Sequence, residues 1–164
     1  MAVLSNVRKL SSRKVAIYVR VSTHWQIDKD SLKVQEKELI VYCEMILGIK
    51  DYVVFNDPGY SAKNTDRPKY QEMMERIRSG EFTHLLVWKL DRISRNIIDF
   101  AMMSEELKQL GVTFVSKNEQ FDTSTAMGEA MLQIIMVFAQ FERKQTAERV
   151  TAVMLSRAED GEWN

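Results

Sequence analysis

The first strong pattern in the chain is a strict alternation of side chains near its start. The stretch VAIYVRVST begins at Val15, and its side chains alternate between two faces as they do in a β-strand. Tyr18, Arg20 and Ser22 therefore share one face of a strand predicted from Lys14 to Ser22. The other face carries only valine and isoleucine, as is typical of a sheet core. An arginine on such a strand needs an explanation other than packing.

Three further strands alternate with helices along the rest of the chain. The strands are predicted at residues 51–57, 84–90 and 112–117. The helices are predicted at residues 31–46, 68–80, 91–111 and 126–158. Strands and helices in alternation form a parallel sheet with helices on both faces. The sequence therefore predicts an α/β fold with an open, mainly parallel sheet in a flavodoxin-like arrangement.

Residues typical of helix ends support these boundaries. Ser31 is the expected N-cap of the first helix, and Pro68 suits the first position of the second helix. Gly80 and Gly111 are expected to end the second and third helices.

The last predicted helix is long for a domain of this size, since ~30 helical residues span ~45 Å. Its segment AMLQIIMVFAQF, residues 130–141, is apolar almost all the way round, whereas a surface helix has one apolar stripe. The apolar belt of this helix consists of Met131, Leu132, Ile134, Ile135, Met136, Val137 and Phe138. We expect the chain to cover one side of this apolar belt and a partner subunit to cover the other. A helix wholly buried within one chain is the alternative.

Composition narrows the class of protein. Lys+Arg and Asp+Glu are both 23, so net charge gives no support for bulk binding to a polyanion. The single cysteine, Cys43, allows no disulfide framework within one chain and is expected to be buried on a helix. No apolar run approaches the ~20 residues of a membrane span, and the polar start does not resemble a secretory signal. These features predict a cytoplasmic protein.

Polar side chains follow the predicted strands at their carboxyl ends, where open α/β sheets form their sites. Ser22 ends the first strand, Arg67 lies in the loop after the second, and Asp91 follows the third. Arg92 and Arg95 come directly after Asp91 and would be one turn apart on a helix that starts there. The arginines expected to converge at this edge are Arg20, Arg67, Arg92 and Arg95, with Arg143 as a possible fifth.

This combination of side chains suits chemistry at a phosphate. An arginine fork binds two phosphate oxygens at once and stays charged at any working pH. Several such forks would stabilise the charge of a transition state and favour ionisation of the Ser22 hydroxyl, which is otherwise a weak nucleophile. Taken singly, a serine at a strand end is usually a turn residue, and an isolated DRxxR is usually a solvated helix start.

Five motifs follow one another along the chain: YVRVST with Gln26, SLKVQ, GYSAKNTDRP, VWKLDRISRN and AQFERKQTAER. In this order they resemble the catalytic domain of the serine recombinases, most closely the large phage and transposon integrases. The resemblance implies a resolvase-like fold and a serine that attacks a DNA phosphodiester. The implied products are a 5′-phosphoserine and a free 3′ hydroxyl, followed by strand exchange and religation without ATP, metal or another cofactor.

The same resemblance implies roles for individual residues. Ser22 matches the nucleophile, and Asp91 matches the acid that accompanies the phosphate-binding arginines. Those arginines match Arg20, Arg67, Arg92 and Arg95. The positions similar to active-site or near-site residues of the family are Tyr18, Gln26, Gln35, Glu142 and Arg143. Ala62 departs from a glycine that is frequent in the family, and His24 fills a variable position.

The resemblance also implies a division of the chain. Residues 1–13 are expected to be a flexible start and 14–125 the catalytic core. Residues 126–158 would be the helix of dimer and tetramer assembly on DNA recombination sites. Residues 159–164 resemble the start of a connection to further DNA-binding domains, which predicts a catalytic-domain fragment.

Two other classes of protein remain as alternatives. A phosphate- or nucleotide-binding regulatory domain would use the arginines to hold a ligand, but it would predict a glycine-rich loop after the first strand. The segment HWQIDKDS has no glycine. A non-enzymatic assembly module would use only the long helix. Neither alternative needs Ser22 as a nucleophile.

Overall fold

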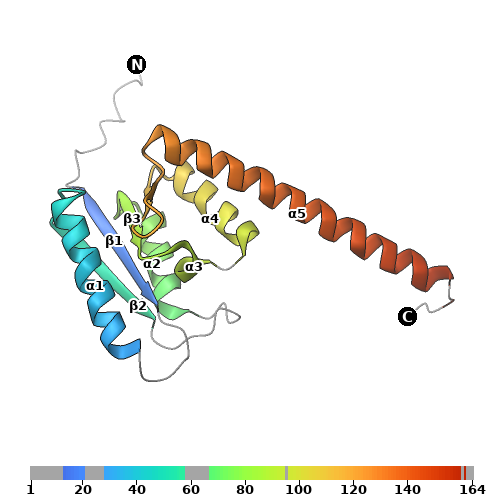
Figure 1. Ribbon diagram of the computed structural model, residues 1–164, viewed down its shortest axis with the longest axis horizontal. Coiled ribbons are helices and arrows are strands. Elements are labelled where there is room, and N and C mark those ends of the chain that lie inside the picture. Colours follow the sequence, from blue (N-terminus) through green and yellow to red (C-terminus); the bar gives the residue numbers. More distant parts are fainter. Residues whose placement is uncertain (1–12, 21–27, 58–66, 95, 160, 162–164) are drawn as a thin grey trace, which may run out of the picture.

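A computed structural model describes residues 13–20, 28–57, 67–94, 96–159 and 161 of the chain, and the side chains from residue 32 onward within the first helix. Its centre is a five-stranded sheet in the order β2-β1-β3-β4-β5 (Figure 1). The first four strands are parallel, and the last is antiparallel to β4. The strands are β1 Lys14–Arg20, β2 Asp51–Asp57, β3 His84–Val87, β4 Thr113–Ser116 and β5 Phe121–Asp122. The predicted open, mainly parallel α/β sheet is confirmed.

Helices cover both faces of this sheet. The helices are α1 Asp28–Met45, α2 Pro68–Arg78, α3 Leu90–Ile93, α4 Ile97–Gln109 and α5 Ala126–Glu159. One core cluster joins α1 to its face of the sheet, through side chains such as Leu39 and Cys43. The second core cluster lies on the other face and joins α2, α4 and the start of α5 to the sheet. The expected burial of Cys43 is confirmed.

The alternation along β1 directs its side chains into different layers. Val15, Ile17 and Val19 pack in the cluster under α1, whereas Tyr18 packs in the cluster under α2 and α4. Arg20 follows Tyr18 on the same face and is 2% exposed. The predicted shared face of Tyr18 and Arg20 is confirmed, while Ser22 lies outside the described residues.

Several predicted boundaries are wrong. Helix α1 begins at Asp28, so Ser31 lies within the helix and is not its N-cap. Strand β3 ends at Val87 rather than at residue 90. The short strand β5 was not predicted, because two residues carry no readable period.

The predicted helix over residues 91–111 is divided in two. Helix α3 ends at Ile93, and Ser94 has an extended backbone (φ −145°, ψ 141°). Helix α4 then begins at Ile97, where the Asn96 side chain accepts a hydrogen bond from the N–H of Ile98 at 2.8 Å. The prediction of one continuous helix over residues 91–111 is therefore wrong, and Arg95 lies outside the described residues.

The predicted helix ends at proline and glycine agree with the structure. Pro68 is the first residue of α2. Gly80 and Gly111 have φ of 81° and 71°, a left-handed conformation that glycine adopts without strain, and each comes directly after the C-cap residue of a helix.

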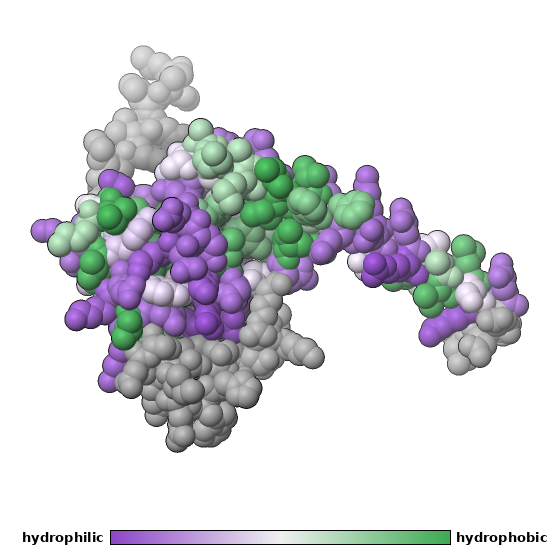
Figure 2. All heavy atoms as spheres, viewed as in Figure 1, coloured by the Kyte–Doolittle hydropathy of each residue, from purple (hydrophilic) through white to green (hydrophobic). Residues whose placement is uncertain are grey.

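Helix α5 begins against the sheet and then extends away from it (Figure 1). Leu132 and Ala139 are buried, and Ile135 and Met136 pack against the core. Ile134, Val137 and Phe138 remain 56%, 65% and 57% exposed. Figure 2 shows this apolar surface along the first half of the helix. One side of the belt is thus exposed in the described structure, so the alternative of a wholly buried helix is wrong, and its cover by a partner subunit stays a prediction. Within the described part of the chain, none of the helices has the length and apolar character needed to cross a membrane.

Candidate active site

Arg20 is buried at the carboxyl end of β1 and held by the backbone of α3. Its Nε donates a hydrogen bond to the carbonyl of Arg92 at 2.8 Å, and its Nη2 donates to the carbonyl of Asp91 at 3.0 Å. A buried charge needs hydrogen bonds of this kind, since desolvation without them costs several kcal/mol. The unusual arginine of the first strand thus has a fixed position at the end of the sheet.

Arg67 reaches the same helix from the start of α2. Its Nη1 donates to the carbonyl of Ile93 at 2.8 Å. Its guanidinium carbon lies 4.2 Å from the ring centroid of Tyr70 and 5.8 Å from that of Tyr18. Contacts of this length between a cation and an aromatic face are attractive. The remaining nitrogen atoms of Arg67 form no hydrogen bond with the residues that the structure describes.

Helix α3 brings these arginines together. Three consecutive carbonyls, those of Asp91, Arg92 and Ile93, accept hydrogen bonds from Arg20 and Arg67. Carbonyls at the end of a helix lack intrahelical partners and carry partial negative charge, so they attract guanidinium groups.

The Arg92 side chain lies close to the acid beside it. Its Nε is 3.8 Å from Oδ1 of Asp91, a loose ion pair. This nitrogen is buried and has no hydrogen-bond partner in the described part of the chain. The structure thus places Arg20, Arg67, Asp91 and Arg92 at one edge of the sheet, as the sequence predicted.

Asp57, which the sequence analysis did not identify, organises the other side of this site. It is 0% exposed at the end of β2. Its Oδ2 accepts from the Tyr18 hydroxyl at 2.9 Å and from the N–H of Tyr70 at 2.9 Å, and its Oδ1 accepts from the N–H of Lys69 at 3.0 Å. The carboxylate therefore satisfies the first amides of α2, where the N-cap Arg67 supplies no side-chain bond. An acid at a strand end, eleven residues before a proline-initiated helix, was the available signal.

The environment of Tyr18 keeps its hydroxyl protonated. Burial raises the pKa of Tyr18 well above its usual range, and the hydrogen bond to Asp57 raises it further, against the opposing charges of Arg67 and Arg20. At neutral pH the hydroxyl is thus a hydrogen-bond donor to Asp57. Tyr18 lies on the same strand face as Arg20, and its expected place near the nucleophile stays a prediction because Ser22 lies outside the described residues.

Glu119 supports α3 from a second direction and was also missed by the sequence analysis. It follows β4, and its Oε2 accepts from the N–H of Leu90 at 3.3 Å and from the Ser116 hydroxyl. The first amide of α3 is thereby satisfied, which fixes the helix that anchors the arginines. Nothing in the sequence of the turn between β4 and β5 indicated that Glu119 would contact α3.

The other predicted site residues are more dispersed. Gln35 faces inward from α1, is 9% exposed, and its Oε1 has no hydrogen-bond partner in the described structure. Glu142 and Arg143 are exposed on α5, and neither forms a hydrogen bond or ion pair with the described residues. Ser22, Gln26 and Arg95 lie outside the described residues, as do His24 and Ala62.

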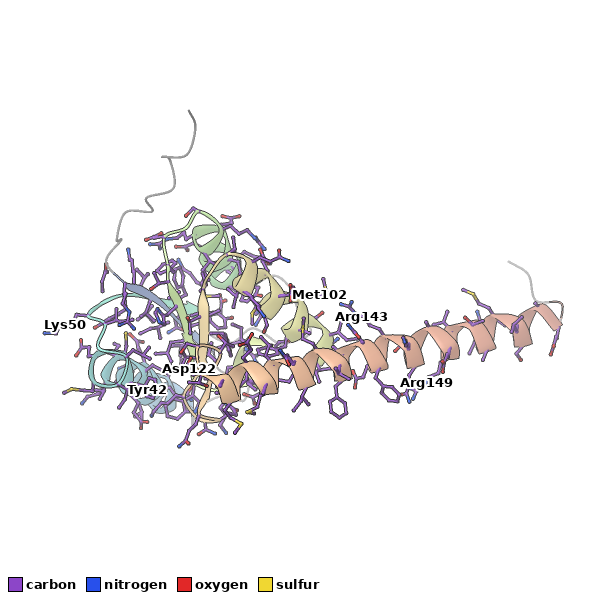
Figure 3. The ribbon with its side chains drawn as sticks, turned by 90° about the horizontal axis from the view of Figure 1, so that it is seen from above. Tyr42, Lys50, Met102, Asp122, Arg143 and Arg149 are labelled. Atoms are coloured by element: carbon purple, nitrogen blue, oxygen red, sulfur yellow. The ribbon has the colours of Figure 1, made fainter. Side chains whose placement is uncertain are left out.

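Arg143 lines a groove of about 600 Å³ between α4 and α5, together with Tyr70, Asp99 and Met102. Figure 3 labels Met102 and Arg143 at the junction of these helices, while Arg149 lies farther along α5. The structure thus brings Arg143 to the groove that Tyr70 also lines.

His84 begins β3, and its Nδ1 lies 2.8 Å from the Thr83 hydroxyl. Among the residues that the structure describes, no group of three or more His, Cys, Asp or Glu side chains could hold a metal ion.

Comparison with known proteins identifies the family. The family model "Resolvase, N terminal domain" matches residues 15–163. The chain belongs to the resolvase family. The predicted resemblance to serine recombinases is confirmed by curated relatives of this family. A DNA-invertase of Enterobacteria phage P7 is 34% identical over 138 residues, which cover 82% of this chain and 65% of the relative. The DNA-invertase BinR of transposon Tn552 from Staphylococcus aureus is 34% identical over 89% of this chain and 70% of its own length.

Solved structures of the family have the same fold. The N-terminal catalytic domain of TP901-1 integrase is 36% identical, with a TM-score of 0.70 over 81% of this chain and 98% of that domain. A resolvase family site-specific recombinase from Streptococcus pneumoniae is 28% identical, with a TM-score of 0.72 over 90% of this chain and 99% of the other. This chain spans about two thirds of the phage P7 relative, which leaves the activity of the whole protein as a matter for proposal.

Proposed function

We propose that this chain is the catalytic domain of a site-specific serine recombinase. The observation that carries the proposal is the anchoring of Arg20 and Arg67 on the carbonyls of α3, at the edge where Ser22 follows Arg20 by two residues. Membership of the resolvase family supports a reaction on DNA, because members are described as invertases and site-specific recombinases. The regulatory-domain and assembly-module alternatives gain no such support.

The proposed reaction is a phosphoryl transfer to serine. The Ser22 Oγ forms a bond to phosphorus, and the bond from phosphorus to the 3′ oxygen breaks. That oxygen takes up a proton, and the serine proton passes to solvent or a nearby base. In rejoining, a 3′ hydroxyl attacks the phosphoserine and releases Ser22, so the bond energy is conserved and no ATP is consumed.

The other predicted site residues would divide the supporting work. Arg20, Arg67 and Arg92 would bind the phosphate and stabilise charge in the transition state, with Arg95 as a fourth arginine. Asp91 would set the position of Arg92 through the loose ion pair. Gln26 and Gln35 would complete the surroundings of the nucleophile, and Glu142 and Arg143 would act from α5.

The proposed partners are double-stranded DNA and further copies of the chain. The exposed side of the apolar belt on α5 would join two subunits, and two such dimers would bring two DNA sites together as a tetramer. The commonest oligomer symmetry is a two-fold dimer. Similarity to the catalytic domain of TP901-1 integrase favours the large integrases as the subclass, in which further domains would supply most DNA affinity.

A trapped covalent adduct tests the proposed reaction. The full-length protein is incubated with a plasmid that carries the DNA flanking its own gene and is then denatured. We expect a protein covalently attached to DNA 5′ ends, no adduct with Ser22→Ala, and an unchanged yield with Ser79→Ala on the far end of α2. An adduct formed by Ser22→Ala would refute the nucleophile. Strict dependence of the adduct on magnesium would refute the metal-free mechanism.

Sedimentation equilibrium tests the assembly. Phe138→Glu changes a side chain that is 57% exposed, so it should weaken self-association without disturbing the core. Met127→Glu, at a side chain 72% exposed near the start of α5, is the matched control. A chain that stays monomeric at high concentration would refute the interface on α5.

A further inference from the structure

Of the two described tyrosines that face Arg67, Tyr70 lies closer to its guanidinium. Its ring centroid lies 4.2 Å from the guanidinium carbon of Arg67, whereas the Tyr18 ring lies at 5.8 Å. We propose that Tyr70 is a positioning residue that holds the Arg67 guanidinium in the orientation needed to bind the scissile phosphate. This inference rests on the proposed function and adds a residue that neither the motifs nor the resemblance assigned.

Tyr70 is itself fixed by contacts with two strands. Its backbone N–H donates to Oδ2 of the buried Asp57 at 2.9 Å. Its ring meets the Tyr18 ring edge-on, at a centroid distance of 5.8 Å and an angle of 72°. The side chain also packs against the core cluster of α2 and α4. A ring held from three directions can serve as a rigid platform for a neighbouring side chain.

Arg67 needs such a platform. It stands at the N-cap of α2 with an extended backbone (φ −102°, ψ 94°), outside the regular helix. Among the described residues its side chain makes one hydrogen bond, to the Ile93 carbonyl. A free arginine side chain loses roughly 2 kcal/mol of rotamer entropy when it is ordered. Stacking on Tyr70 pre-orders the guanidinium and leaves its other N–H groups for a phosphate.

The ring, and not the hydroxyl, makes this contact. The Tyr70 hydroxyl has no hydrogen bond to the part of the chain that is described. Phenylalanine at this position would keep the stacking surface, whereas leucine would keep an apolar volume without the aromatic face. The two substitutions therefore separate positioning of Arg67 from simple packing.

An NMR measurement tests the contact without DNA. The Nε–Hε signal of Arg67 is assigned by its absence in Arg67→Lys. The Tyr70 ring current should shift this signal, and stacking should limit its motion on the nanosecond scale. We expect Tyr70→Leu to move the signal and make it more mobile, and Tyr70→Phe to retain both properties. Tyr52→Leu, at a half-buried tyrosine on β2 in the other core cluster, is the matched control. An unchanged Arg67 signal in Tyr70→Leu would overturn the proposal.

Adduct formation tests the consequence for the reaction. Because cation–aromatic contacts contribute about 1 kcal/mol, Tyr70→Leu should slow formation of the DNA adduct about five-fold. Tyr70→Phe should restore most of the rate, and Tyr52→Leu should leave it unchanged. If Tyr70→Leu and Tyr70→Phe are equally slow, or if Tyr70→Leu disturbs Arg67 without slowing the reaction, the positioning role is wrong. Failure of the unchanged protein to form any adduct would refute the proposed function instead, and the NMR result would still decide the contact.

Discussion

The two ends of the sheet hold arginines in different ways. At the amino end, Arg76 donates two hydrogen bonds of 2.7 Å to the Glu81 carboxylate, and Lys14 donates to the same carboxylate at 2.8 Å. At the carboxyl end, Arg20 and Arg67 donate to backbone carbonyls of α3. Both ends fix their guanidinium groups, but with partners of different charge.

This difference separates arginines that stabilise the fold from arginines that can bind an anion. A carboxylate neutralises the arginine that it holds, whereas a carbonyl is a neutral dipole that orients a guanidinium and leaves its positive charge in place. The Asp57 carboxylate at the carboxyl end is engaged by the Tyr18 hydroxyl and two backbone amides. Among the described residues, Arg67 at the carboxyl end has no carboxylate partner and can therefore attract an anion, whereas Arg76 at the amino end is already paired with Glu81.

The largest expected effect is that of replacing Arg20, at the carboxyl end, by lysine. The same replacement of Arg76, at the amino end, is its control. Arg20→Lys should slow formation of the DNA adduct by on the order of 100-fold, because an ammonium cannot reproduce the planar fork that spans two α3 carbonyls. Arg76→Lys should leave the rate nearly unchanged. Quantified adduct yields over time provide the measurement. Equal losses for both variants would remove the functional distinction between the two ends.

Asp57→Asn should have the next largest effect, on stability. An amide offers one acceptor oxygen where the carboxylate serves one hydroxyl and two N–H groups, so a buried donor loses its partner. The free energy of unfolding should fall by about 2 kcal/mol, as measured by urea denaturation. Asp51→Asn, at the exposed start of β2, is the control and should change the free energy of unfolding by less than ~0.5 kcal/mol. A loss of the same size at both positions would show that Asp57 has no special part in the fold.

The ion pairs of the amino end should appear as a dependence of stability on pH. Hydrogen bonds from Arg76 and then Lys14 lower the pKa of Glu81 from 4.5 to about 2. A lowered pKa stabilises the fold above the unfolded value, and this contribution is lost as the pH falls from 4.5 towards 2. Glu81→Gln should therefore be less stable than the unchanged chain at neutral pH, with the difference shrinking across that window. Urea denaturation at several pH values measures it, with the exposed Glu105→Gln as control. A difference independent of pH would contradict the ion-pair origin.

The smallest expected effect is stabilisation by a simple anion. Inorganic phosphate at about three times its dissociation constant should raise the melting temperature by about 2 °C, relative to chloride at equal ionic strength. Arg67→Ala should abolish this rise, and Arg76→Ala should retain it, because Arg67 donates to a backbone carbonyl and has no carboxylate partner among the described residues, whereas Arg76 is paired with Glu81. Thermal unfolding followed by circular dichroism provides the measurement. Loss of the rise in Arg76→Ala alone would place the anion at the wrong end of the sheet.

Much of this fold could be predicted because its elements have clear periods. Strand β2, the start of α2 and the length of α5 agree with their predicted bounds within a residue or two. The break between α3 and α4 was missed because apolar residues continue on both sides of Ser94, so the helical period passes through a segment with extended backbone. Local propensity is weak compared with the tertiary contacts that hold α3 at both ends.

The alternation along β1 by itself placed Arg20 beside Tyr18 on one face, and the all-round apolar segment of α5 by itself indicated an unpaired surface. Only the tertiary structure decided which groups hold the arginines. The two α3 carbonyls that hold Arg20 are 71 and 72 residues away from it along the chain. Asp57 accepts a hydrogen bond from the N–H of Tyr70, which is 13 residues away along the chain. It also decided that Ile135 and Met136 face the core while Val137 and Phe138 do not. A repeat of two or 3.6 residues fixes which side chains share a face, whereas contacts across such separations depend on how strands pair and helices dock.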